Sequence, residues 1–174
     1  MKPDINTVGG LMPSTRYEGQ LTRLSEEITD SVVNSGATTV SPGQPVGRDP
    51  SNPRCGRLAI STDEIVGISL RDPVTYHADS SGNVGFAQYR SIPFLRFGYC
   101  GLTPIEQVHA GEGLVAIFSS ETGAFTGWGS TAGGISSTRR LMNGHKWETD
   151  TAAEASEPGE VSAISTGTVN YVTY

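Results

Sequence analysis

The stretch FLRFGYCGL, residues 94–102, decides the fold class, because apolar and aromatic side chains alternate along it as they do in a β-strand. Odd-numbered positions of such a strand would lie on one face of a sheet and even-numbered positions on the other. Alternating aromatic strands usually pack inward, so the large side chains should line the core or an oligomer interface. These side chains are Phe94, Leu95, Phe97 and Tyr99.

Two hairpins are expected after this strand. In the first, residues 114–119 and 124–128 flank a turn that contains Gly123. In the second, residues 138–142 and 145–149 flank Asn143-Gly144. Asn-Gly is typical of a two-residue hairpin turn, since both of its positions need a positive φ.

The remaining segments are also short. Residues 161–164 and 168–174 predict a last pair of strands. Residues 103–106, TPIE, have the spacing of a helix capping box, but Gly111 limits any helix there to a short turn. Many short strands separated by frequent turns predict a mainly β protein, either a barrel or a sandwich.

Composition supports this prediction. The chain has 174 residues, enough for one domain, and its 22 Gly, 19 Ser and 18 Thr make up about a third of it. These residues are weak helix formers, so long helices are not expected. The net charge of −6 argues against binding nucleic acid through its phosphates. The longest apolar run, residues 114–118, is too short to span a membrane.

Cys55 and Cys100 are far apart in the sequence, and we expect two free thiols in a reducing compartment. Residues 1–10 do not show the basic-then-apolar pattern of a signal peptide.

The chain divides into an arm and a body. Residues 1–16 predict an extended arm, because prolines and glycines interrupt them and no regular period is present. Residues 17–174 predict a β-rich domain with a proline-rich loop at 41–54, holding at most a short strand near Val46, and an acidic loop at 148–160. Apolar side chains would be wasted on a free tail, so we expect those of the arm to be anchors that dock on a partner. These anchors are Ile5, Val8, Leu11, Met12 and Tyr17.

No catalytic pattern is visible in the sequence. The three histidines, His77, His109 and His145, do not have the spacing of a metal site. Residues 127–134 are rich in glycine but lack the lysine of a phosphate-binding loop, and no helix is expected after them. Neither cysteine has a base near it in the sequence. We therefore expect no enzymatic activity, no cofactor and no metal.

Several short motifs follow one another in a distinctive order. They are Tyr17-Glu18-Gly19, Gly43-Gln44-Pro45-Val46, IVGISL at 65–70, PFLRFGY at 93–99 and VHAGEGLV at 108–115. In order and spacing they resemble the structural cement, or decoration, proteins of tailed bacteriophage capsids. The resemblance covers about residues 17–135.

The resemblance implies a non-enzymatic protein of the virion, made in the bacterial host cytoplasm and placed on the outer surface of an icosahedral head. Its partners would be the major capsid protein and further copies of itself, as a homotrimer or homodimer, with no direct contact to nucleic acid or membrane. It would stabilise contacts between major capsid subunits. The implied fold is a small barrel- or tulip-like body of short antiparallel strands with an extended N-terminal arm.

Other functions remain open at this level. The composition also suits another phage structural module from a tail, a fibre or a head-completion complex. A small hydrolase would need a site assembled from distant residues. A carbohydrate-binding module could use Trp128, Trp147 and the tyrosines as a stacking platform.

Overall fold

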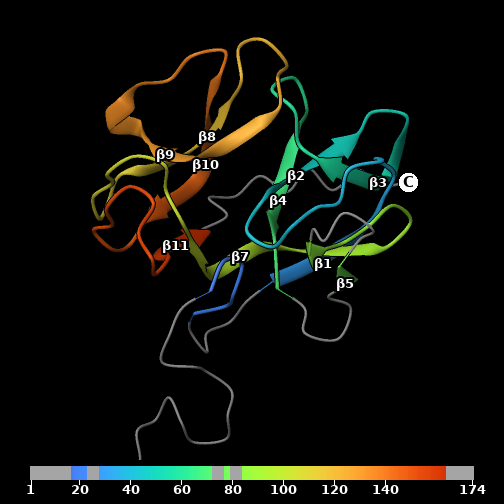
Figure 1. The fold of residues 1–174 in the computed structure, drawn as a ribbon, viewed down its shortest axis with the longest axis horizontal. Helices are drawn as coiled ribbons and strands as arrows, with labels where there is room; N and C mark the ends of the chain where they lie inside the picture. Colours follow the sequence, from blue (N-terminus) through green and yellow to red (C-terminus); the bar gives the residue numbers. More distant parts are fainter. Residues whose placement is uncertain (1–16, 23–27, 72–76, 79–83, 164–174) are drawn as a thin grey trace, which may run out of the picture.

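The computed structural model describes residues 17–22, 28–71, 77–78 and 84–163 (Figure 1). Strands dominate these residues, which contain no α-helix and have a 3₁₀ turn at Thr131–Gly133. The prediction of a mainly β protein is thus confirmed. No helix in the described ranges is long and apolar enough to cross a membrane. The arm 1–16 lies outside the described residues, as does the expected strand 168–174.

Nine strands form one sheet in the order β1-β3-β2-β4-β7-β11-β10-β8-β9, and β5 and β6 form a separate pair. The strands are β1 (Ile28–Asn34), β2 (Pro45–Asp49), β3 (Asn52–Leu58), β4 (Ile65–Ser69), β5 (His77–Ala78), β6 (Val84–Gly85), β7 (Ser91–Leu102), β8 (Gly113–Phe118), β9 (Phe125–Ser130), β10 (Arg139–Trp147) and β11 (Gly159–Ala163).

The sheet closes on itself at one end. β1 pairs with β3 in parallel and with β7 in antiparallel orientation, so β1, β3, β2, β4 and β7 form a partial ring of five strands. The other four strands, β11, β10, β8 and β9, extend from β7 as an open sheet. Figure 1 shows the ring and the open sheet on opposite sides of the molecule, with β7 between them.

The central strand β7 lies between two hydrophobic clusters. Leu95 belongs to the larger cluster, which includes Leu114 and Trp147, whereas Phe94 packs with Phe86 in the smaller one. Phe94 and Leu95 are both buried although they point to opposite faces, because each face of β7 meets a different part of the core. The side chains of Phe97 and Tyr99 are half-buried. A role of these residues in an oligomer interface stays a prediction.

The hairpin of β8 and β9 agrees with the one predicted from the sequence. The second predicted hairpin is wrong, because Asn143-Gly144 lies inside the single strand β10. On both sides of this dipeptide β10 pairs with β8, and the register shifts between Leu141 and Lys146. Gly144 has a positive φ of 74°, which here forms a bulge, since both flanking segments stay paired with the same neighbour.

The proline-rich segment 41–54 is also more regular than predicted. It contains all of β2 and the first residues of β3, which pair as a hairpin. Its prolines disturb the ladder little: Pro45 begins β2, Pro50 lies in the turn, and Pro53 lies in β3 where the register with β2 shifts. In the acidic segment, residues 148–158 form no strand, while Gly159 and Glu160 begin β11.

Candidate functional site

Two of the recognised motifs meet in space where the predicted arm would leave the body. The Gly19 amide donates to the carbonyl oxygen of Gly101 at 2.8 Å, and the Gly43 amide donates to that of Ser69 at 2.8 Å. A Cβ on Gly19 would lie 2.5 Å from the Gly43 nitrogen, and both glycines have a positive φ. This contact therefore needs glycine at both positions. We call residues 17–19, together with Gly43, the arm root.

The open sheet is tied to the arm root by a tryptophan. Trp128 of β9 is 1% exposed, and its Nε1 donates to the carbonyl oxygen of Gly43 at 2.6 Å. Its indole packs edge-on against the ring of Phe125, with 5.1 Å between the centroids. A residue far away in the sequence thus holds the loop on which Gly19 rests.

Glu18, the middle residue of the 17–19 segment, joins the arm root to Thr103. Its carboxylate accepts hydrogen bonds from Thr103 Oγ1 at 2.6 Å and from the Thr103 amide at 3.2 Å. Burial raises the pKa of the Glu18 carboxyl above its ordinary value, although the two bonds from Thr103 act in the opposite direction. The sequence predicted a capping-box role for Thr103, whereas the structure uses its hydroxyl to hold Glu18.

Tyr17 is the one predicted anchor within the described residues. Its side chain is 45% exposed, and the Arg71 guanidinium lies over its ring at 4.9 Å from the centroid. The other four anchors, Ile5, Val8, Leu11 and Met12, lie outside the described residues. The ring of Tyr17 is therefore presented at the surface where residues 1–16 join the body.

Residues 103–106 do not form the short helical turn that their sequence allowed. Glu106 instead forms an ion pair with Arg139. Glu106 accepts two bonds from the Arg139 guanidinium, at 2.6 and 3.1 Å, and one from the Ser130 amide at 2.8 Å. These bonds lower the pKa of the Glu106 carboxyl. The carboxylate thus joins the loop before β8 to the beginning of β10.

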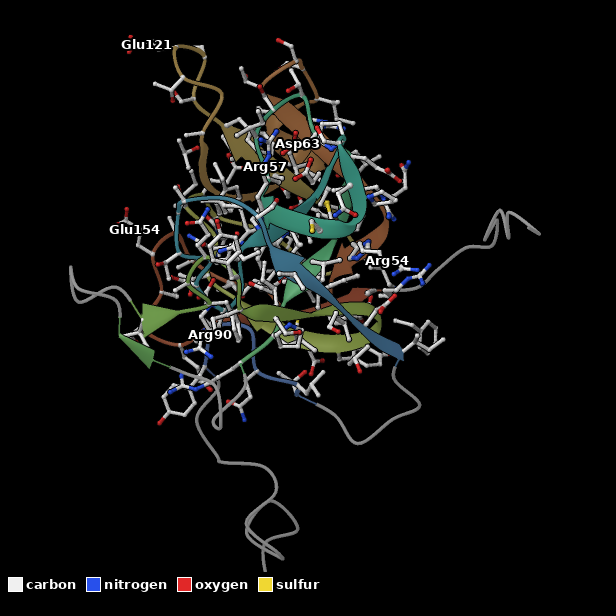
Figure 2. The ribbon with its side chains drawn as sticks, turned by 90° about the vertical axis from the view of Figure 1, so that its right-hand side faces the viewer. Arg54, Arg57, Asp63, Arg90, Glu121 and Glu154 are labelled. Carbon is white, nitrogen blue, oxygen red and sulfur yellow. The ribbon has the colours of Figure 1, made fainter. Side chains whose placement is uncertain are left out.

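Two arginines, one from each half of the sheet, bond to the loop between β3 and β4. Arg57 of β3 donates to both carboxylate oxygens of the buried Asp63, at 2.9 and 3.1 Å (Figure 2). Arg140 of β10 donates to the main-chain oxygens of Ser61 and Asp63 in the same loop. The Arg140 contacts thus join the open sheet to the ring, whereas the Arg57–Asp63 ion pair holds the loop against β3 within the ring.

The described residues contain no group of three histidine, cysteine, aspartate or glutamate side chains that could hold a metal ion. His109 is exposed and lies 3.6 Å from Asp150. Cys55 and Cys100 are both free, as expected. Trp128 and Trp147 are buried in the core, so they do not form a stacking platform for a sugar.

The partly closed β body has a counterpart among solved structures. A chain of a solved structure entitled "The capsid of Myoviridae Phage XM1" has the same fold, with a TM-score of 0.64 at 16% sequence identity, over 88% of this chain and 92% of that chain. No curated protein matches the sequence significantly.

The family model "Structural cement protein (E217 gp24/Pam3 gp6)" matches residues 5–165. The chain belongs to this family of phage structural cement proteins, which confirms the resemblance seen in the sequence. The resemblance identified the motifs at 17–19 and 43–46, but no signal in the sequence pointed to Trp128 as the residue that joins them to the open sheet.

Proposed function

We propose that the protein binds the outer surface of an icosahedral phage head and stabilises contacts between major capsid protein subunits, without catalysing a reaction. The observation that carries this proposal is the family match, which spans nearly the whole chain. A cement protein occupies many equivalent sites on a shell, so modest contacts at each site add up to firm attachment. The protein would bind as a homodimer or homotrimer.

The arm would supply a large share of these contacts. An extended segment covers much surface for few residues and becomes ordered when it docks. The arm root supports this role, since the contacts among Gly19, Gly43 and Trp128 fix residues 17–19, which directly follow the arm in the sequence. Tyr17 would continue the row of anchors formed by Ile5, Val8, Leu11 and Met12.

Mixing the purified protein with expanded, DNA-free heads of its phage tests the proposal. We expect regular density on the outer surface by electron microscopy and a higher temperature of head disruption. Bare heads with unchanged heat resistance would refute the function.

A variant that lacks residues 1–16 but keeps Tyr17 tests the arm separately. We expect it to fold, because the described residues form two hydrophobic clusters among themselves, and to bind heads at least about tenfold more weakly. Its melting temperature is the control for folding. Undiminished binding would refute the role of the arm while leaving the cement function intact.

A further inference from the structure

The ring of five strands opens onto the surface at a hollow of about 380 Å³. Every strand of the ring contributes to its wall, and we call this hollow the ring mouth. Its lining residues are Asp30, Ser31 and Val32 of β1, Arg48 of β2, Pro53 and Arg54 of β3, Val66 of β4 and Phe94 of β7.

The ring mouth has an apolar floor and a charged rim. Val32, Val66 and Phe94 form the floor, and Phe94 is 4% exposed. On the rim, Arg48 donates to Glu64 at 3.1 Å and to the Pro53 carbonyl at 3.0 Å.

The remaining rim charges are not equally engaged. Asp30 lies 3.6 Å from Arg96. The Arg54 side chain, labelled in Figure 2, has no partner among the described residues, and only its main-chain amide makes a hydrogen bond, to Asn52. The rim therefore offers a cation that no described residue neutralises, on a chain whose net charge is −6.

Strand edges border the same hollow. β1 and β3 are paired only at Val33 with Cys55 and at Asn34 with Gly56. Residues 28–32 of β1 pair with β7 on their other side, and no described residue pairs with them on the side of β3. This part of β1 is therefore an open strand edge, and it begins with an exposed apolar side chain, since Ile28 is 58% exposed. Such an edge accepts an added strand through main-chain hydrogen bonds.

A neighbouring hollow lies on the other side of β4 in the strand order. A second hollow, of about 230 Å³, lies between β4 and β10, and Val66 lines both of them. Leu141, which is 39% exposed, forms part of the wall of the second hollow. Two hollows that share a lining residue suit an elongated occupant better than a compact small molecule.

We propose that the ring mouth receives an extended, carboxylate-bearing segment of a major capsid protein subunit. The segment adds a strand to the open edge of β1, places an apolar side chain against Phe94 and brings its carboxylate to Arg54. The unneutralised guanidinium selects the charge, the strand edge selects an extended backbone, and the apolar floor selects the anchoring side chain. This inference rests on the proposed function, because it names the surface through which the body holds the shell.

Charge reversal at Arg54 tests the inference, with Arg90 as a matched control. Both arginines are exposed and have no side-chain partner among the described residues, and Figure 2 shows them at separate places on the molecule. Arg54→Glu should weaken binding to expanded heads by about tenfold or more, whereas Arg90→Glu should leave it unchanged. Equal melting temperatures would show that both variants fold.

Photo-crosslinking identifies the occupant. A photoreactive residue in place of Ser31, which is exposed and lines the ring mouth, should crosslink to an acidic segment of the major capsid protein on decorated heads. The same residue in place of Glu121, at the far hairpin tip in Figure 2, should not reach that segment.

The outcomes separate the two proposals. If the wild-type protein leaves heads bare, the cement function fails and the ring-mouth inference fails with it. If the wild type decorates heads and Arg54→Glu binds equally well, only the ring-mouth inference is overturned. A crosslink from position 31 solely to another copy of this chain would also overturn it, by showing that a second copy fills the mouth.

Discussion

Replacing Trp128 with phenylalanine should destabilise the body and loosen the arm root in particular. The substitution keeps a ring to pack on Phe125 but removes the donor that bonds to the buried Gly43 carbonyl at 2.6 Å. A buried acceptor left without its partner costs about 1–3 kcal/mol. For a domain of this size, about 2 kcal/mol lowers the melting temperature by roughly 4–8 °C.

Trp147 provides a matched control, because it is also buried and its Nε1 donates to a glycine carbonyl, that of Gly129, at 3.0 Å. Trp147→Phe should lower the melting temperature by a similar amount without touching the arm root. Hydrogen exchange separates the two variants. Trp128→Phe should speed exchange of the Gly43 amide, which bonds to Ser69, beyond what the lower global stability explains.

Two results would refute this reasoning. An unchanged melting temperature for Trp128→Phe would show that the indole bond does not stabilise the body. Equal Gly43 exchange in the two tryptophan variants, at matched stability, would show that Trp128 does not hold the arm root.

Three other predictions follow from burial and charge. A thiol reagent should modify Cys55 in the folded protein and leave Cys100 unmodified, because Cys100 is fully buried and burial raises the pKa of its thiol; labelling of both at equal rates, read by mass spectrometry, would contradict this. The bonds from Arg139 lower the pKa of Glu106, so the stabilisation that they provide is present above the ordinary glutamate pKa and is lost as the pH falls through the lowered value. Glu106→Gln should therefore reduce the free energy of unfolding by about 1 kcal/mol near neutral pH, and urea titrations should show that this difference vanishes in acid. Burial raises the pKa of Glu18, so the stability that this shift contributes is present in acid and is lost as the pH rises through the raised value. The melting temperature of Glu18→Gln should therefore rise relative to that of the wild type between pH 4 and pH 7, and a relative fall over that range would contradict this.

The local pattern of the sequence was enough to predict the β class and several elements. Alternation over residues 94–102 predicted the strand that became the centre of the sheet, and the apolar runs on either side of Gly123 predicted the β8–β9 hairpin. The order of the short motifs was enough to predict the family. These features depend on the period of neighbouring side chains and on turn residues, which a sequence displays directly.

Where patterns were ambiguous, distant partners decided the outcome. Asn143-Gly144 supplies the positive φ that a turn and a bulge both use, and pairing with β8 on both sides made it a bulge. Glu106 has the spacing to cap a helix, but Arg139, far along the chain, bonds to its carboxylate instead.

The sequence by itself therefore determined several of the strand-forming segments, the scarcity of helix and the family. Only the tertiary structure decided that β1 closes a ring with β7, that Trp128 holds Gly43 at the arm root, and that Arg54 stands at an open mouth of the ring. The physical reason is that strand pairing and buried hydrogen bonds join residues far apart in the chain. Their free energy depends on which surfaces the whole fold brings together, and the local spacing of apolar residues in the sequence does not contain that information.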